Sequence, residues 1–133
     1  MNAVFLDTVG VLALLEPSDQ WHEAATRAST SPSLAGLPFA TTTLVLLECG
    51  NAVARKPYRG RVAAMRREFR DDGSLIVPTD ADLEAAWDAY ERGEAGFAGI
   101  VDHVSFVVMR RLGLTRAFTN DAHFKAAGFE TLF

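Results

Sequence analysis

The segment that decides the fold is VDHVSFVVMRRLGLTRAFTNDAHFKAAGF, residues 101 to 129. Its first part predicts a helix that begins at Asp102, has apolar residues at helical spacing and ends at Gly113, because glycine commonly terminates helices. Residues Ala117 to Thr119 then predict a short buried strand. Asp121 follows that strand and precedes a second helical pattern. A helix, a strand and a helix in this order indicate an α/β fold with Asp121 near the carboxyl end of a strand.

The rest of the chain repeats this alternation. Short apolar runs predict strands at residues 2–6, 39–41, 74–77, 117–119 and 129–133. Helical spacing, caps and breakers predict helices at residues 9–15, 21–28, 44–55, 59–70, 81–91 and 102–112. Such alternation implies βαβ crossovers and helices on both faces of a parallel sheet. We therefore predict one α/β domain, residues 1–133, with three α/β/α layers around a central, mainly parallel sheet of four to five strands.

Composition restricts the class of protein. The chain has 133 residues, of which 49% are hydrophobic and 23% charged, and these are values of a globular domain. No apolar run is long enough for a membrane span, and the N-terminus has neither a basic leader nor a cleavage pattern, so we expect a cytoplasmic protein without a membrane partner. The single cysteine cannot form an internal disulfide, and no Cys/His cluster indicates zinc.

Charge is segregated along the chain. The net charge of −4 argues mildly against a nucleic-acid partner, but residues 55–70 contain seven cations and one acid and therefore carry +6. Because arginine suits phosphate, this segment could hold a nucleic-acid backbone. Its candidate contacts are Arg55, Arg59, Arg66, Arg67 and Arg70. A solvated basic helix, or a contact with an acidic partner protein, remains an alternative.

Three aspartates lie at predicted helix starts. Asp7 follows the first strand, Asp121 follows the fourth, and Asp102 opens the helix before it. Each could simply cap a helix, which is worth about 1 kcal/mol. The carboxyl ends of parallel strands meet at one edge of a sheet, where ligands bind. Asp7 and Asp121 are both expected at that edge.

Glu48 lies in TTTLVLLECGNAVARK. The first turns of this predicted helix are apolar on nearly all sides, which is typical of a buried helix. A buried carboxylate needs a compensating partner. A salt bridge to Arg55 or Arg116 is one possibility. A divalent cation shared with the aspartates is the other, and a set of carboxylate oxygens favours Mg²⁺ or Mn²⁺ over zinc.

Three blocks of this sequence resemble the PIN-domain family, in particular the VapC-type toxin ribonucleases. The blocks are LDTVGVLALLEPSDQWHEAA, TTTLVLLECGNAVAR and VDHVSFVVMRRLGLTRAFTNDAHFKAAGF, and together they span nearly the whole chain. The resemblance implies that four acids are catalytic and bind metal: Asp7, Glu48, Asp102 and Asp121. It also implies that Thr8, Ser105 and Asn120 are supporting polar residues. One departure is Val9-Gly10, where a bulkier apolar residue than glycine is common in the family.

The same resemblance implies an activity. It indicates a metal-dependent endoribonuclease that holds one or two Mg²⁺ or Mn²⁺ ions and hydrolyses RNA phosphodiesters with a metal-activated water. With RNA as the substrate, the basic segment at residues 55–70 is the expected RNA-binding arm. The resemblance further implies a cognate antitoxin and a homodimer. Alternatives are a non-catalytic PIN-like module that binds RNA or protein, and a housekeeping RNA-processing nuclease. An aspartate-nucleophile phosphatase is disfavoured because Val9 stands where such enzymes need a second acid.

Four further residues are assigned structural roles. His103 and His123 lie beside two of the acids in sequence, but neighbouring helical side chains do not face the same way, so we exclude both from the predicted site. Trp87 and Tyr90 fall at helical spacing, and we assign them to the core rather than to a base-stacking surface.

Overall fold

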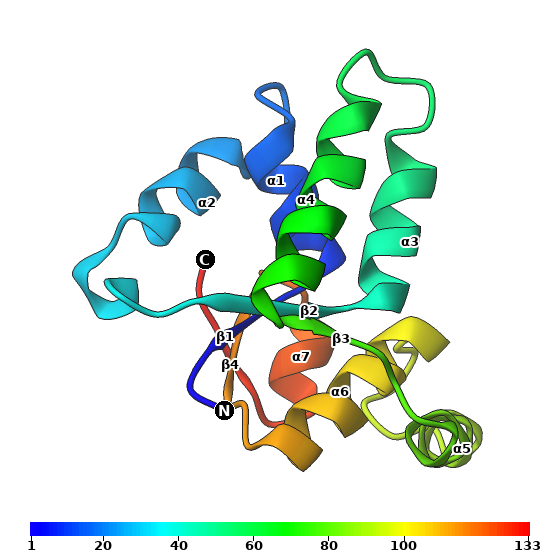
Figure 1. Ribbon diagram of the computed structural model, residues 1–133. Helices are drawn as coiled ribbons and strands as arrows, with labels where there is room; N and C mark the ends of the chain where they lie inside the picture. The colour runs from blue at the N-terminus through cyan, green and yellow to red at the C-terminus, as the bar shows by residue number, and fades with distance from the viewer.

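The computed structural model describes all 133 residues and contains one five-stranded sheet whose order is β3-β2-β1-β4-β5 (Figure 1). All four strand pairings are parallel. The strands are β1 (Val4–Leu6), β2 (Phe39–Thr42), β3 (Leu75–Ile76), β4 (Arg116–Phe118) and β5 (Glu130–Thr131). The helices are α1 (Thr8–Leu15), α2 (His22–Ser29), α3 (Thr43–Ala52), α4 (Arg59–Asp72), α5 (Asp80–Glu91), α6 (Ile100–Leu112) and α7 (Ala122–Ala126), with a 3₁₀ turn at Pro32–Leu34.

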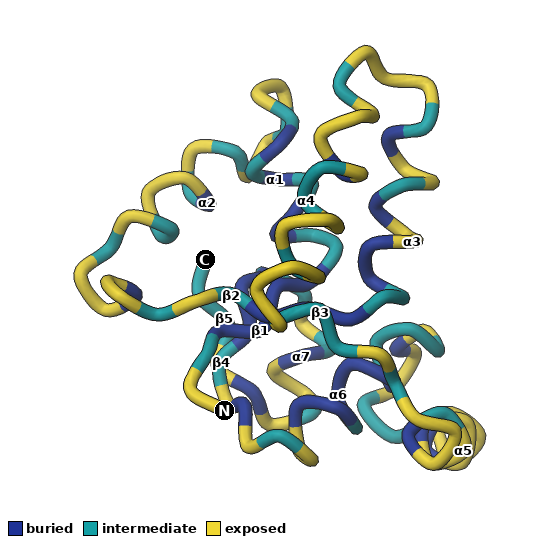
Figure 2. Tube along the Cα trace, viewed as in Figure 1, coloured by how far each residue is buried: buried dark blue, intermediate teal, exposed yellow.

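The sheet separates two layers of helices. In Figure 1, α1 to α4 lie on one side of the strands and α5 to α7 on the other. Figure 2 shows the buried residues concentrated along the central strands and the inner sides of these helices. All of β1 is buried, including Phe5, which has no exposed surface. The predicted three-layer α/β/α fold with a parallel sheet is therefore confirmed. None of the helices combines the length and the apolar character needed to cross a bilayer.

The order in which strands are added to the sheet reverses at β1. This strand pairs with β2 on one side, where Val4 is opposite Phe39, and with β4 on the other, where Phe5 is opposite Ala117. The connections from β1 to β3 run over one face, and the later connections run over the other (Figure 1). In open α/β sheets ligands bind beyond the strand ends at such a switch point. The ends of β1 and β4 are therefore the expected place for a site.

Several predicted boundaries were wrong by a few residues. The helix predicted to end at Arg55 ends at Ala52, because the chain already turns at Val53. The helix predicted to begin at Asp102 begins at Ile100 with Gly99 as its N-cap, so Asp102 lies within the first turn.

The assignment of Trp87 and Tyr90 to the core was wrong. Trp87 is 50% exposed and Tyr90 is 47% exposed. They stack edge to face on α5 with ring centroids 5.5 Å apart. The small residues Ala86 and Ala89 face the core instead, so α5 packs closely through alanines and leaves its larger aromatic side chains partly in solvent.

Gly10 explains the departure from the family pattern. It is buried in α1, where a Cβ atom would lie 2.1 Å from the backbone oxygen of Phe118 in β4. Only glycine allows this close approach of helix and strand. The contact joins the beginning of α1, just after Asp7, to the end of β4, just before Asp121.

Candidate metal centre at the strand ends

Asp7 and Asp121 are joined through Thr119 beyond the ends of β1 and β4. The Thr119 hydroxyl donates to Asp7 Oδ2 at 2.9 Å and accepts from the Asp121 backbone N–H at 3.1 Å. Asp7 and Thr119 are both buried. The predicted site did not include Thr119, although this residue begins the Thr-x-Asp element of the closing block. Its role became visible only through the contact between the two strands.

The three aspartates at helix starts, Asp7, Asp102 and Asp121, do not all act as helix caps. Asp121 does cap α7, because its Oδ1 accepts from the His123 backbone N–H at 2.9 Å. Asp7 precedes α1, but its side chain makes no capping hydrogen bond. Asp102 lies in the first turn of α6, whose N-cap is Gly99, and no side-chain hydrogen bond caps this helix. Capping therefore does not account for Asp7.

His123 lies beside two of the acids, although the sequence argument placed it away from the site. One ligand atom from each of Asp102, Asp121 and His123 falls within 4.8 Å of the other two. The His123 Nδ1 atom is 3.1 Å from Asp121 Oδ1 and 3.9 Å from Asp102 Oδ2. The rule for neighbouring helical side chains fails here because Asp121 is an extended cap residue outside the helix.

His103 packs among aromatic side chains. It is buried, and its ring packs edge to face against Tyr90 and Phe106, at centroid distances of 6.0 and 5.6 Å. Its Nε2 atom has no hydrogen-bond partner. The apolar contacts indicate a packing role.

The argument that Glu48 is buried was wrong. Glu48 is exposed, and the adjacent Leu47 is 64% exposed, because α3 packs on its neighbours through Val45, Leu46 and Cys49. Neither predicted salt bridge forms: Arg116 instead donates to the Ser33 carbonyl oxygen, and Arg55 makes no ion pair. Glu48 Oε1 accepts from the Thr8 hydroxyl at 2.6 Å, which holds this carboxylate next to the residue that follows Asp7.

Mutual repulsion links all four carboxylates. Burial, followed by the charge of Asp102, raises the pKa of Asp7 from 3.8 to about 7. Burial, followed by the charges of Asp121 and Glu48, raises the pKa of Asp102 from 3.8 to about 6. The carboxylates are close enough to oppose each other's ionisation, which is the electrostatic condition that a bound cation relieves.

The donor set fits a hard divalent cation. Carboxylates outnumber the one nearby imidazole, which favours Mg²⁺ or Mn²⁺ over zinc. Ser105 lies one helical turn after Asp102, and its hydroxyl is buried without any hydrogen-bond partner. Asn120 is half-buried beside Asp121 and makes no side-chain hydrogen bond. A cation with its bound waters would supply partners that the protein itself does not provide to Ser105.

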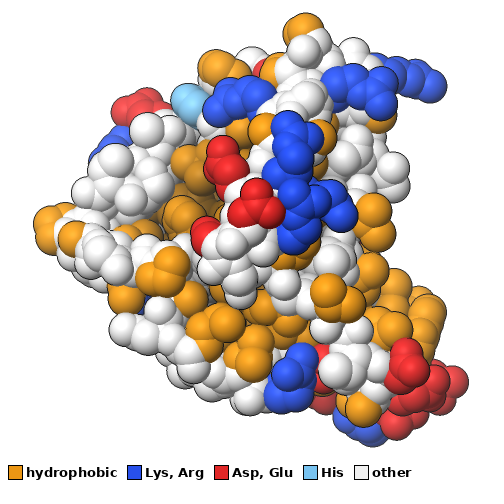
Figure 3. Space-filling view, viewed as in Figure 1, with side chains coloured by type: hydrophobic (Ala, Val, Ile, Leu, Met, Phe, Trp, Pro, Cys, Tyr) orange, Lys and Arg blue, Asp and Glu red, His pale blue; other side chains and the backbone are white.

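The five candidate RNA-binding arginines are all exposed on the side of α3 and α4. Arg55 lies in the turn after α3, and the others lie on α4. Arg70 pairs with Asp71 at 3.0 Å, whereas Arg59, Arg66 and Arg67 make no ion pair. Figure 3 shows blue side chains following α4 down one face of the molecule.

The raised pKa of Asp7 predicts how the metal-free protein responds to pH. Well below pH 3.8, this carboxyl is protonated in both folded and unfolded chains. Between 3.8 and about 7 only the folded chain retains the proton, so stability falls as pH rises, by a total on the order of 4 kcal/mol for this group above pH 7. In EDTA, Asp7→Asn should therefore melt higher than wild type at pH 8 and lose most of this slope. Thermal melts of both proteins from pH 4 to 8 measure this difference, with Glu130→Gln as an exposed control. If the stability of Asp7→Asn fell with pH as steeply as that of wild type, Asp7 would not be the group responsible.

No family model matches this chain, but individual proteins do. The 23S rRNA-specific endonuclease VapC20 of Mycobacterium tuberculosis is 32% identical over 132 residues, which cover 95% of this chain and 95% of that protein. The crystal structure of VapC20, a Sarcin-Ricin loop cleaving toxin, has a TM-score of 0.76 at 30% identity and covers 96% of both chains. Two further structures agree in fold alone. FitAcB from Neisseria gonorrhoeae has a TM-score of 0.61 at 16% identity and covers 98% of this chain and 96% of its own. PAE2754 from Pyrobaculum aerophilum has a TM-score of 0.53 at 24% identity, with 99% and 92% covered.

A parallel α/β/α sheet with clustered carboxylates beyond the ends of its central strands defines the PIN-domain class of nucleases. Within that class, its identity to VapC20 over nearly the full length of both proteins shows that this chain belongs to the VapC family of toxin endonucleases.

Proposed function

We propose that this chain is a Mg²⁺- or Mn²⁺-dependent endoribonuclease and the toxin of a toxin–antitoxin pair. The observation that carries the proposal is the cluster of Asp7, Asp102 and Asp121 at the switch point of the sheet, where the pKa values of Asp7 and Asp102 are raised to about 7 and 6. Such perturbed acids are typical of functional sites. Crowding them without a cation lowers the stability of the fold, so a structural role alone does not explain their arrangement.

Four carboxylates would hold one or two ions: Asp7, Glu48, Asp102 and Asp121. A bound divalent cation supplies Lewis-acid chemistry, which lowers the pKa of a water and neutralises charge on the scissile phosphate. The chain's own residues orient the ligands: Thr119 holds the Asp7 carboxylate and Thr8 holds that of Glu48. The residues with unfilled hydrogen-bonding capacity beside them are Ser105 and Asn120. We propose that these two position water or the RNA backbone.

RNA is the substrate class that the relatives favour. VapC20 is described as a 23S rRNA-specific endonuclease and as a toxin that cleaves the Sarcin-Ricin loop. We propose ribosomal RNA as the first substrate to test for this chain, which would place its action in the cytoplasm. A purified sample would be incubated with ribosomes in Mn²⁺ or in EDTA, and the ends of the rRNA mapped by primer extension. Discrete metal-dependent cleavage supports the proposal, whereas intact rRNA and intact total RNA at high enzyme concentration would contradict it.

The basic segment is proposed to hold the RNA backbone. Arg67 is exposed and unpaired, and Arg55 and Arg70 extend the positive surface on either side of it. Removing one phosphate-binding cation should reduce the dependence of binding on salt by about one unit of slope. Reversing the charges of Arg67 and Arg70 should therefore weaken RNA binding and flatten the salt dependence, with little effect on metal affinity. An unchanged slope would remove this segment from the RNA interface.

The alternatives differ in cellular effect. A housekeeping nuclease would be harmless when expressed, and a non-catalytic module would bind RNA without cutting it. We favour the toxin because all four acids are present and the chain belongs to the VapC family. Expression should arrest growth, and co-expression of a cognate antitoxin, which we expect to be encoded beside the toxin gene, should relieve the arrest. We also propose a homodimer, since apolar side chains are exposed on α3 and α5.

A further inference from the structure

Phe97 has the most exposed large apolar side chain of the molecule. It is 99% exposed, whereas Val77, the next in order, is 69% exposed. Phe97 lies in the loop between α5 and α6, within the sequence GEAGFAG at residues 93–99. A phenylalanine ring that remains in water contributes nothing to the hydrophobic core. The packing of the domain therefore gives no reason for an aromatic side chain at this position.

The residues around Phe97 are fixed to the body of the domain. Ala95 packs against the core and Ala98 is 3% exposed within it, so the chain is anchored two residues before the ring and one residue after it. Glu94 accepts a hydrogen bond from Arg110 of α6 at 3.0 Å. Ala95 also has a φ of 55°, a conformation that is unfavourable for a residue other than glycine. The loop therefore holds the exposed ring in a defined place.

That place is close to the candidate metal centre. Gly99 is the extended N-cap of α6, and Asp102 is the third residue of this helix. Two extended residues and less than one helical turn separate Phe97 from Asp102, which puts their Cα atoms within roughly 12 Å of each other. A nucleotide whose phosphate lies at the carboxylates can reach the ring across this span.

Helix α3 borders the same region. Leu44 of α3 and Ile100 of α6 pack against one buried cluster, so the first half of α3 lies beside the start of α6. Glu48 follows Leu44 by four residues and therefore lies on the same face of α3. The carboxylates of Glu48 and Asp102 raise each other's cost of ionisation, which confirms that they are near neighbours. The loop with Phe97 thus enters α6 at the edge of the acidic cluster.

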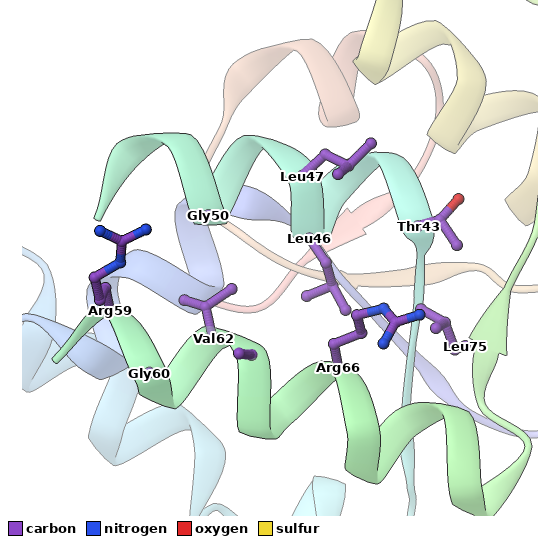
Figure 4. Close-up of a pocket in the computed structure, with 10 residues that line it drawn as sticks. Thr43, Leu46, Leu47, Gly50, Arg59, Gly60, Val62, Arg66 and Leu75 are labelled. Atoms are coloured by element: carbon purple, nitrogen blue, oxygen red, sulfur yellow. The ribbon is translucent and has the colours of Figure 1, made fainter. Parts of the chain in front are cut away.

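The other exposed aromatic rings lie on elements that carry none of the four acids. Trp21 begins α2. Trp87 and Tyr90 stack on each other on α5, which has five acids and no cation and would repel phosphate. Figure 4 shows the cavity of about 520 Å³ between α3 and α4, and none of the ten residues that line it is aromatic. Phe97 is therefore the ring best placed to meet a base at the candidate site.

We propose that Phe97 is a substrate-binding residue, on whose ring an unpaired base of the RNA stacks next to the phosphate that is cleaved. Bases of single-stranded RNA stack on aromatic side chains, and every base has a π face suited to this contact. The stacked base fixes the nucleotide, so that the adjacent phosphate is held at the carboxylates. The inference rests on the proposed function, because it requires that this site cleaves RNA.

Three substitutions separate stacking from apolar contact. On a short single-stranded RNA in Mn²⁺, Phe97→Ala should lower kcat/KM about 10- to 100-fold, the loss expected for one stacked base. Phe97→Trp keeps a ring and should retain cleavage, whereas Phe97→Leu keeps apolar surface without a ring and should lose most of it. Trp21→Ala, which removes an exposed ring elsewhere, is the matched control and should cleave normally. Because Phe97 is exposed and binds no ion, the melting temperature and its response to Mn²⁺ should not change.

The stacked base is identified with RNAs that lack one base at a time on either side of the mapped cleavage point. At one position, removal of the base should lower cleavage by the wild type as much as Phe97→Ala does. Combining the two changes should lower cleavage no further, because each removes the same contact. Losses that add at every position would show that ring and base do not touch.

Failure of the inference is distinguishable from failure of the proposed function. If the wild type cleaves RNA and Phe97→Ala or Phe97→Leu cleaves equally well, the stacking role is wrong and the nuclease stands. If Phe97→Ala changes the sedimentation coefficient of the protein, the ring belongs to a contact between protein chains, and the stacking role is again wrong. If the wild type leaves RNA intact in Mn²⁺, the proposed function fails and the inference fails with it.

Discussion

Replacing Asp121 by asparagine is expected to reduce metal-dependent RNA cleavage roughly 10²- to 10⁴-fold, since removal of a metal ligand takes away several kcal/mol of transition-state stabilisation. The protein should stay folded. Asp121 Oδ1 caps α7 through the His123 backbone N–H, and an asparagine oxygen accepts that bond about as well. Its backbone bond to Thr119 does not involve the side chain and is kept.

The same substitution removes a negative charge that raises the pKa values of Asp7 and Asp102. Without metal, Asp121→Asn should therefore melt at the wild-type temperature or above it. Cleavage would be followed on end-labelled RNA in Mn²⁺, with folding checked by circular dichroism and Glu130→Gln as the control. Normal cleavage by Asp121→Asn would show that this residue is only a helix cap.

Replacing Gly10 by alanine is expected to destabilise the protein by about 3 kcal/mol or more, because the added Cβ overlaps backbone atoms that cannot rotate away. That atom would lie 2.1 Å from the Phe118 backbone oxygen and 2.8 Å from Phe118 Cδ1. Relief requires α1 to move from β4. Since Asp7 precedes α1 and Thr119 follows β4, the movement should also weaken the hydrogen bond between them and reduce cleavage.

Gly60→Ala is the matched control. Gly60 is also helical, but a Cβ there would meet nothing within 4 Å. Its replacement should be neutral or should stabilise the helix by about 0.5–1 kcal/mol. Urea denaturation of both variants measures the difference. Equal stability of Gly10→Ala and wild type would mean that helix and strand are not in close contact at this position.

The spacing of apolar residues, together with the residues that begin and end helices, was sufficient to predict the fold. Apolar runs such as Val4–Leu6, followed directly by an acid and a helix, are strands in the structure, and their alternation with helices indicated the parallel sheet. The placement of Asp7 and Asp121 followed from the same logic, because residues that end parallel strands share an edge. The errors in helix limits arose where a turn or a cap, as at Val53 and Gly99, carries little sequence signal.

Side-chain environment was less predictable. The apolar pattern around Glu48 suggested burial, yet Leu47 and Glu48 are both exposed. A helix whose own residues are apolar on all sides can bury one face and leave another face exposed. Trp87 was misassigned for the same reason. Thr119 and His123 join the site through contacts across strand and helix ends, which a one-dimensional pattern does not contain.

The central claim is that these carboxylates form a divalent-cation site. The most direct test is the melting temperature of the wild type at pH 8 with EDTA and with millimolar Mn²⁺ or Mg²⁺. An ion present at about 100 times its dissociation constant stabilises the folded state by about 2.7 kcal/mol, which raises the melting temperature by roughly 5–10 °C. We expect that increase in the wild type and its loss in Asp7→Asn. An unchanged melting temperature of the wild type at millimolar metal would contradict the account.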